Sequence, residues 1–535
     1  MSAEFLPKQA GPAPEFPPAR YLLAVFLAAL GVAALFWAPL LLGGALQGHD
    51  WSTHHFHYFD WVRRSFTGYG VVPLYMADAW VTPNFLANAE APTFGPLAWL
   101  LLVLPTGAYI KFLIVCFTAL GLAGGWLLAR DLGGAPPIAV FASATFAFGG
   151  FFVSHLAVGH HWAMGVWLLP GLVWLARRAV LGSDAALVAA AAVNAFTILG
   201  GQHQPFVWQN LLLGAVAALW ALQARAWFPL RRMVLLVVFS AGLGAVKLVP
   251  LWLAFADYAP EARIQGLPLG SLLDALLARG QTAEWIDPHI VHLWGAGWWE
   301  YAFYVGPFAL AVVALGLAAS RGAWVLALVG AFFAVLAMEP SPLWAGIQDL
   351  PIWRSQRCPA RFLVLGLFGV IFAAVPGLER LRRLAARRDA KWVAALAWAI
   401  AALASVDLWV ESRVWQRAAT GPAIAERDHR PQPEAVRAGS GVARLADFAP
   451  NRLVYAIESP GEARFVLPLR FAAGEWIADG ASTGTADGWL TLDVPAGERR
   501  VVLRYAPRGL VPGALVSGLT VLACGGFLWL RRRSA

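Results

Sequence analysis

The segment after the first long apolar run holds the residues best suited to chemistry. Asp50 follows that run directly, and His54, His55 and His57 come next. A carboxylate at the point where a span leaves the bilayer can act as a general base on an acceptor hydroxyl, and partial burial can tune its pKa. Asp50 is therefore the candidate catalytic residue. The alternative is that Asp50 only caps the helix of the following loop.

The same segment offers ligands for a divalent metal, because imidazole and carboxylate groups are both suitable. On a regular helix, His54 and His57 share a face with Asp50 and Asp60, whereas His55 points elsewhere. If a metal is present, we expect Asp50, His54 and His57 to bind it. The alternative is that these histidines are only the polar side of an interfacial helix.

Cationic side chains near the outer ends of other apolar runs can bind a lipid phosphate. Lys247 lies near the end of one run, and Arg354, Arg357 and Arg361 precede another. An ionisable residue at membrane depth is a functional candidate, and arginine grips phosphate with two hydrogen bonds. The alternative is that these side chains only extend to the lipid headgroups.

Other polar and aromatic residues of the outer loops can contact a sugar or an acceptor. The candidates are His54, His57, Asp60, Glu90, His203 and Trp298. Tryptophan is also the usual residue of the membrane interface, which is the simpler explanation for Trp298. Whether His160, His161 and His203 converge with the segment around Asp50 stays open from sequence alone.

Membrane-spanning helices must position these residues. The 535 residues are 59% hydrophobic and 13% charged, whereas about a quarter of a soluble protein is charged. The long apolar runs approach the roughly 20 residues that cross a bilayer. We therefore expect an all-α polytopic membrane protein with about twelve transmembrane helices. They begin near residues 21, 107, 135, 162, 184, 206, 231, 301, 323, 361, 391 and 509.

The charges predict topology rather than a nucleic-acid partner. The net charge is +9, but the arginines cluster at the ends of apolar runs, and no basic face carries interleaved aromatics. The positive-inside rule places both termini in the cytoplasm, with residues 1–20 as a tail. This assignment treats residues 96–105 as a re-entrant or interfacial helix. All eleven histidines then lie outside, with large loops at 45–106, 254–300 and 340–360.

The chain divides into a transmembrane domain over residues 21–410 and a different region over residues 411–508. The second region is rich in proline, glycine and charge, and it contains short runs of alternating apolar and polar residues. Such runs between turn residues indicate a small antiparallel β-rich domain, which the topology places outside the cytoplasm. Residues 509–535 then form a final transmembrane helix and a basic cytoplasmic tail.

A series of short motifs runs through most of the chain. They are Asp50, Pro73-Leu74-Tyr75, Asn88-Ala89-Glu90-Ala91, Gly95-Pro96, Phe146-Ala147-Phe148-Gly149-Gly150, Gly201-Gln202-His203-Gln204, Val249-Pro250, Cys358-Pro359-Ala360-Arg361-Phe362, Ala472-Ala473-Gly474-Glu475-Trp476 and Tyr505-Ala506-Pro507. In this order they resemble the YfhO-like bacterial integral membrane proteins, which belong with the GT-C-fold glycosyltransferases. Two departures are that Tyr75 occupies a tryptophan position and that the turn at Gly201 has a different order of residues.

The resemblance implies a bacterial cytoplasmic-membrane transferase. It would pass a sugar from a polyprenyl-phosphate donor to a cell-envelope glycan or lipid on the outer side. Asp50 would be the base, and Arg361 would lie near the donor phosphate. A bound Mg²⁺ or Mn²⁺ is optional in this interpretation.

Two alternatives are a non-catalytic transporter or flippase for a lipid-linked glycan and a scaffold for envelope assembly. A flippase needs polar groups along a transmembrane path, and these spans have few. The scaffold would need the β-rich domain but not Asp50.

Overall fold

The computed structural model describes the chain except for short gaps. The described residues are 16–76, 84–255, 263–290, 297–320, 323–350, 353, 356–425, 427, 437–438, 441–470 and 475–534. Arg354 lies outside these residues, so its expected role in binding phosphate stays a prediction.

Helices dominate the described chain. Their bounds are α1 (Ala19–Phe36), α2 (Ala38–Leu42), α3 (Phe56–Tyr69), α4 (Thr106–Asp131), α5 (Pro136–Ala147), α6 (Gly150–Val158), α7 (Leu169–Val180), α8 (Asp184–Leu199), α9 (His203–Ala224), α10 (Phe228–Leu243), α11 (Ala245–Phe255), α12 (Leu272–Leu277), α13 (Pro307–Ala319), α14 (Trp324–Ala337), α15 (Pro342–Ile347), α16 (Leu363–Ala386), α17 (Ala390–Ala418) and α18 (Leu510–Ser534). A π-helix, η1 (Trp51–His55), precedes α3, and short 3-10 helices include η2 (Ala98–Leu102), η3 (His161–Leu168), η5 (Trp298–Glu300) and η7 (Pro359–Phe362).

Proline and glycine set many of the helix ends. Proline lies in the first turn of α5, α7, α10, α13 and α15, where its missing N–H group leaves no hydrogen bond unmade. Gly70 and Gly159 end α3 and α6 in the left-handed conformation. Gly159 matters most, because it turns the chain directly into His160 and His161.

The apolar helices make the chain a multi-pass membrane protein. Eight helical stretches in the described chain are long and apolar enough to cross a membrane, and α10 with α11 forms one more candidate that is bent by 82°. Three shorter apolar helices are α8, α13 and α14. The expected twelve spans are therefore not confirmed, since that number requires the bent pair and all three short helices to be counted.

Two segments differ from expectation. Residues 96–105 contain only the short 3-10 helix η2 rather than a longer interfacial helix. Helix α17 continues to Ala418, past the expected end of the transmembrane domain at residue 410. The polar end of α17 stays helical because it packs inside the protein: Glu411 accepts a hydrogen bond from Gly280 N, and Gln416 donates to Phe36 O.

The C-terminal region contains the expected β-rich unit. Two four-stranded antiparallel sheets have the strand orders β10-β11-β8-β5 and β6-β7-β12-β9. The strands are β5 (Arg437–Ala438), β6 (Val442–Ala449), β7 (Arg452–Ser459), β8 (Ala463–Arg470), β9 (Trp476–Asp479), β10 (Ser482–Ala486), β11 (Trp489–Val494) and β12 (Gly497–Tyr505). Alternate residues of β7, β8 and β12 fill one apolar core, including Leu453, Phe465 and Leu503.

This β unit holds the long loop between α3 and η2. Leu74 N donates to Asn451 Oδ1 at 2.7 Å, and Asn451 Nδ2 donates to Val72 O at 2.8 Å. The ring of Tyr75 enters the β core, and Asn84 Nδ2 donates to Glu475 Oε1 at 2.9 Å. The Pro-Leu-Tyr motif therefore anchors this loop to a domain encoded far along the chain.

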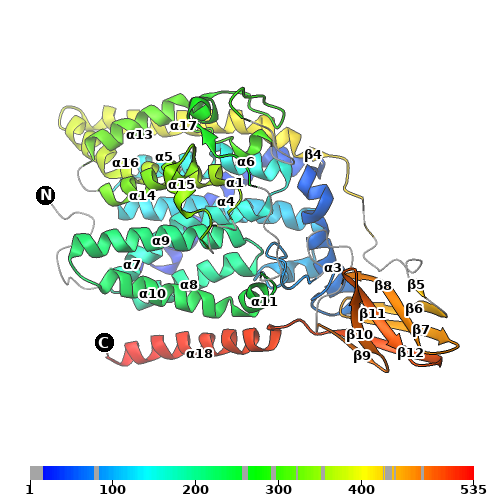
Figure 1. Ribbon diagram of the computed structural model, residues 1–535. Helices are drawn as coiled ribbons and strands as arrows, with labels where there is room; N and C mark the ends of the chain where they lie inside the picture. Colours follow the sequence, from blue (N-terminus) through cyan, green and yellow to red (C-terminus); the bar gives the residue numbers. More distant parts are fainter. Residues whose placement is uncertain are drawn as a thin grey trace.

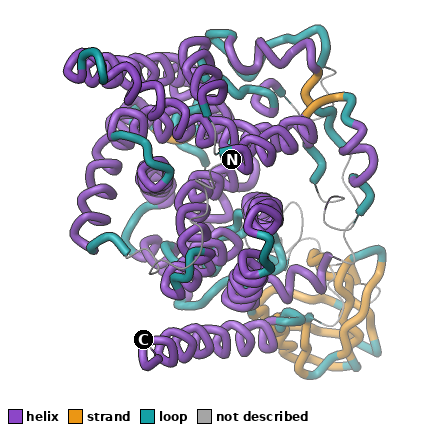
Figure 2. The backbone as a smooth tube through the Cα atoms, turned by 90° about the vertical axis from the view of Figure 1, so that its left-hand side faces the viewer, coloured by secondary structure: helices purple, strands orange, loops and turns teal. Residues whose placement is uncertain are grey.

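Helix α18 returns from the β unit along the helical bundle, so its C-terminal end lies at the opposite end of the bundle (Figure 1). It lies at the edge of the bundle when seen from the side (Figure 2), and only 11% of its apolar window is buried. Ser517 of α18 forms hydrogen bonds on both sides of the break between α10 and α11: its Oγ donates to Leu243 O and accepts from Val246 N. The free backbone groups at the bend are thereby satisfied.

Candidate functional site

Asp50 lies where the first loop leaves the helical bundle, directly before η1. Its carboxylate is 2.8 Å from His49 Nδ1 and 2.8 Å from His160 Nε2, and its side chain is 20% exposed. Burial alone would raise the pKa of Asp50. The hydrogen bond and charge of His160, with help from His55 and His49, instead hold the pKa below its ordinary value of 3.8. Asp50 is thus an ionised carboxylate that small molecules can still reach.

The π-helix changes which histidines approach Asp50. One ligand atom each of Asp50, His54 and His55 lie within 4.8 Å of one another. A π-helix makes i→i+5 bonds and has more residues per turn than an α-helix, so His55 returns above Asp50. The structure therefore brings His54 and His55 to Asp50, whereas the sequence predicted a group of Asp50, His54 and His57. His57 Nε2 contacts Ser52 O at 3.0 Å instead.

His55 joins this loop to Glu90. Its Nδ1 lies 2.6 Å from Gly159 O and its Nε2 lies 2.9 Å from Glu90 Oε2. Burial favours the neutral forms of both groups, but their mutual attraction raises the pKa of His55 and holds the pKa of Glu90 well below its ordinary value. The approach needs a glycine at 159, since a Cβ there would lie 2.3 Å from Trp51 N.

Basic groups surround Glu90 on its buried side. Lys247 is 0% exposed and its Nζ donates to Ala91 O. His161 is also buried, its ring centroid is 4.6 Å from that of His55, and neither ring nitrogen has a hydrogen-bond partner in the described chain. The charge of His203 also lowers the pKa of Glu90. The histidines of three separate loops therefore converge, which the sequence left open.

A second carboxylate, Glu300, lies in a more enclosed cluster. Arg361 holds it with two hydrogen bonds, Nε to Oε2 at 2.6 Å and Nη2 to Oε1 at 2.5 Å. Arg361 Nη1 also donates to Gln204 Oε1 at 2.9 Å, and the guanidinium lies 4.6 Å from the ring centroid of Trp162. Burial alone would raise the pKa of Glu300, but Arg361 and His155 hold it well below the ordinary value. Arg361 is thus paired inside the protein rather than presented to a phosphate.

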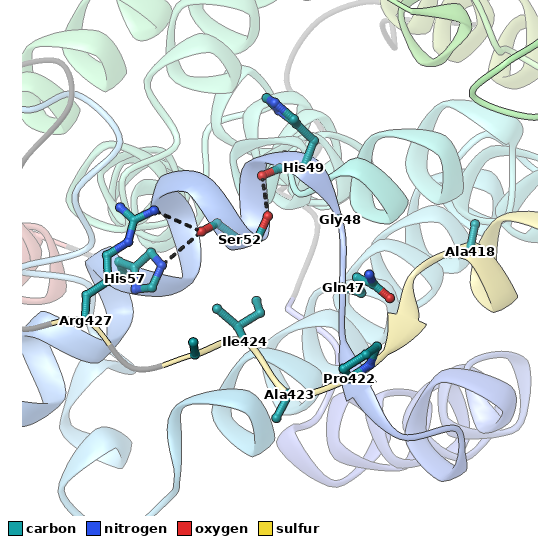
Figure 3. A pocket seen from close by; sticks show the side chains of 11 residues that line it. Gln47, Gly48, His49, Ser52, His57, Ala418, Pro422, Ala423, Ile424 and Arg427 are labelled. Atoms are coloured by element: carbon teal, nitrogen blue, oxygen red, sulfur yellow. Dashed lines mark hydrogen bonds between the residues drawn. The ribbon is translucent and has the colours of Figure 1, made fainter.

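A cavity of about 700 Å³ opens next to the segment that carries Asp50: His49 and Ser52 line it, but Asp50 itself does not. Its walls are the turn before η1, with Gln47, His49 and Ser52, and the segment after α17, with Pro422, Ile424 and Arg427. Figure 3 shows the side chains of His57 and Arg427 converging on the carbonyl oxygen of Ser52. Strands β1 (Ala45–Leu46) and β4 (Thr420–Gly421) pair next to it and hold the two walls together. The cavity is large enough for a small-molecule ligand.

Two residues that were expected to contact a sugar instead form hydrogen bonds inside the protein. Asp60 is 5% exposed, and its carboxylate accepts from Arg64 Nε at 2.6 Å and Thr106 Oγ1 at 2.9 Å. Trp298 is 0% exposed and donates to Gln281 Oε1 at 2.7 Å. Neither side chain is free to contact a sugar. Arg357 is described, and its carbonyl oxygen accepts from Ile264 N.

The Asp50 cluster does not suit Mg²⁺, which prefers oxygen ligands. It offers one carboxylate and two imidazoles, and both nitrogens of His55 already contact Gly159 O and Glu90. These three residues therefore do not match the ligands that Mg²⁺ prefers, and the optional Mg²⁺ or Mn²⁺ stays a prediction.

Sequence reasoning did not assign roles to His155, His160 or Glu300. Each lies in a different short segment, and only the tertiary fold brings them together. The one available signal is the pair of histidines after Gly159, because a glycine–histidine–histidine turn at the outer end of a span places two imidazoles at membrane depth.

No protein-family model matches the sequence, and none of the curated proteins does. Two solved structures are similar to the chain. One is the arabinofuranosyltransferase AftD from Mycobacteria, with a TM-score of 0.44 and 17% identity over 75% of this chain, although the match spans only 27% of that longer chain. The other is ArnT from Cupriavidus metallidurans bound to undecaprenyl phosphate, with a TM-score of 0.42 and 14% identity over 75% of this chain and 77% of that chain.

Proposed function

We propose that this protein is a membrane glycosyltransferase that moves a sugar from a polyprenyl-phosphate donor to an envelope glycan or lipid. The observation that carries the proposal is the arrangement around Asp50. A partly exposed carboxylate lies between His49 and Ser52 in the sequence, and those two residues line a cavity of about 700 Å³. The buried cation Lys247 and the histidines of three loops lie in the same region. The motifs resembling YfhO-like, GT-C-fold proteins support the same function.

Asp50 would orient the acceptor hydroxyl and take its proton as the new glycosidic bond forms. His160 Nε2, 2.8 Å away, fixes the direction of the carboxylate. The acceptor would occupy the cavity between the turn at His49 and the segment at Pro422. Among the described residues, no lysine or arginine forms an ion pair with the Asp50 carboxylate, whose partners are His49 and His160. The carboxylate therefore suits a neutral hydroxyl as its acceptor.

The departing polyprenyl phosphate is an anion, and it needs a positive environment where it separates from the sugar. Lys247 and His161 provide buried donors on the far side of Glu90. Arg361 is held by Glu300, so we assign it to shaping the site rather than to binding phosphate. Arg357 and Arg354 stay candidates for the outer part of the phosphate site.

We further propose that the chain lies in the bacterial cytoplasmic membrane with its termini inside and the β unit outside. The helical bundle separates the C-terminal end of α18 from the β unit (Figure 1). With twelve crossings, the histidine clusters and the cavity would share the outer face.

The test compares envelope glycans of cells that lack the protein and are complemented with the native chain or with Asp50→Asn at matched membrane levels. We expect the native chain to restore a missing sugar and the variant to lower transfer by about 10²–10⁴-fold, the usual contribution of a general base. Asp60→Asn is the matched control and should keep transfer, because Asp60 is a nearby carboxylate in α3 that does not line the cavity. Equal restoration by native chain and Asp50→Asn would remove Asp50 from the chemistry and favour a transporter or scaffold.

A further inference from the structure

Three buried residues that can each offer a ligand atom gather next to Asp50. One ring nitrogen each of His155 and His160 and one carboxylate oxygen of Glu300 lie within 4.8 Å of one another. All three residues are buried, at 0%, 6% and 1% exposure. They come from α6, from the turn that follows it and from η5, so the fold alone assembles them.

The hydrogen bonds around the two histidines decide where their protons lie. His155 Nδ1 lies 2.9 Å from Phe151 O, and a carbonyl only accepts, so Nδ1 carries the hydrogen and Nε2 keeps a lone pair. His160 Nε2 lies 2.8 Å from the ionised carboxylate of Asp50, so Nε2 carries the hydrogen and Nδ1 keeps its lone pair. Neither His155 Nε2 nor His160 Nδ1 has a hydrogen-bond partner in the part of the chain described.

Lone pairs that face a carboxylate inside a protein are unfavourable unless a cation lies between them. His155 Nε2 is 3.5 Å from Glu300 Oε2, a contact that makes no hydrogen bond. Two ligands of one tetrahedral zinc ion, each roughly 2.0–2.2 Å from the metal, stand roughly 3.4 Å apart. The observed separation therefore matches two ligands of a shared ion.

We propose that His155, His160 and Glu300 bind a divalent transition-metal ion of the zinc type. Two imidazoles and one carboxylate are a known zinc-binding set that leaves a fourth position open. Asp50 accepts a hydrogen bond from the other nitrogen of His160, as outer carboxylates do for metal-bound histidines. The ion would thus hold His160 in place, and His160 would hold Asp50.

This site is distinct from the Asp50–His54–His55 group, with which it shares no residue. It is also independent of the proposed sugar transfer, because its test measures metal and not activity. Arg361 takes one acceptor position on each oxygen of Glu300, and an ionised carboxylate has about four such positions, so Glu300 can still bind an ion. The carboxylates of Glu300 and the neighbouring Asp50 offset much of the charge of the guanidinium and the ion.

The experiment uses the full chain, purified in detergent, stripped with a chelator and reloaded with Zn²⁺ alone. We expect stoichiometric zinc in the native protein by elemental analysis and at least tenfold weaker binding in His155→Gln and His160→Gln. His54→Ala and His289→Ala are the controls, and both should keep the zinc. His289 is an exposed histidine outside the cluster.

Loading the native protein with Co²⁺ gives a second measurement that does not depend on the folding of any variant. Visible absorption bands typical of a four-coordinate ion with imidazole ligands are expected. The absence of stoichiometric metal, or an octahedral spectrum, would overturn the proposal and leave His155 sharing a proton with Glu300. Zinc that survives in both glutamine variants but is lost in His54→Ala would also overturn it, because the ion would then lie at the Asp50–His54–His55 group.

Discussion

Glu90 and Glu300 are carboxylates of two separate loops, one partly buried and one buried, and the chain surrounds them differently. Glu300 is 1% exposed in its side chain and is held at both oxygens by Arg361. Glu90 is 23% exposed in its side chain and contacts His55 through one oxygen. A permanently charged guanidinium donates to both oxygens of the first carboxylate, whereas the second contacts an imidazole whose charge changes near neutral pH.

The comparison shows that a buried ion pair does not by itself mark the reacting group. At Glu300 the charges satisfy each other, and the pair links η5 to η7. Near Glu90, two basic side chains make few hydrogen bonds. His161 makes none in the described chain, and Lys247 donates to the backbone carbonyl of Ala91. Glu90 differs in that two basic groups near it, Lys247 and His161, make no hydrogen bond to its carboxylate, whereas Arg361 makes two to Glu300.

The largest effect is expected from breaking the ion pair between Arg361 and Glu300. Arg361→Met leaves Glu300 charged and buried without its partner, which should lower the free energy of unfolding by about 3–5 kcal/mol. Thermal unfolding in detergent, followed by tryptophan fluorescence, measures the loss. In the double variant Arg361→Met, Glu300→Met, the cost should be smaller than in the single variant, because no charge remains unpaired. Equal costs for the single and double variants would show that packing, not charge, holds this region.

A smaller effect tests the close approach behind Glu90. Gly159→Ala introduces a side chain at φ +118°, with a Cβ 2.3 Å from Trp51 N, and should cost about 1–3 kcal/mol in strain. It should also push Asp50 and His55 away from His160 and Glu90, so activity should fall together with stability. Gly70→Ala is the control: it has φ +65° but nothing within 4 Å of the added Cβ. If the two variants behave alike, the contact at Gly159 does not position the site.

The smallest effect separates the two carboxylates by pH. His55 has a pKa raised above its ordinary 6.5, so its contribution to stability is complete below 6.5 and is lost as the pH rises through the raised value. Glu90 has a pKa lowered below 4.5, so its contribution is complete above 4.5 and is lost as the pH falls through the lowered value. The pair therefore contributes most between these two ordinary values.

His55→Gln should accordingly lower the melting temperature more at about pH 5.5 than at about pH 8.5. Arg361→Met should show no such difference, because the guanidinium stays charged throughout this range. A His55→Gln effect that is independent of pH would mean that the His55–Glu90 contact is a neutral hydrogen bond.

The helices and the β unit could be predicted from the sequence because their signals are local. A helix occupies every one of the expected apolar runs, and the alternating runs after residue 440 form strands. The end of α17 could not be placed, since Glu411 and Gln416 look like loop residues until their partners Gly280 and Phe36 are known.

The site was less predictable, for two reasons. The prediction that His57 rather than His55 accompanies Asp50 assumed an α-helix, and no residue type between Trp51 and His55 indicates the π-helix that the structure has there. Arg361 was expected to face a lipid phosphate because its partner, Glu300, lies in a separate loop. Asp50 was identified from its position alone, and its contacts with His160 and His49 required the fold.

The contacts between the β unit and the long loop after α3 have a consequence for the order in which the protein assembles. A ribosome delivers Leu74 and Asn84 long before it delivers Asn451 and Glu475, which hold them. The bend before Ala245 likewise waits for Ser517. We therefore expect the helices to enter the membrane in order before the loop after α3 makes its contacts with the β unit. The site would then be completed late in synthesis, and a truncated chain would have inserted helices but an incomplete site.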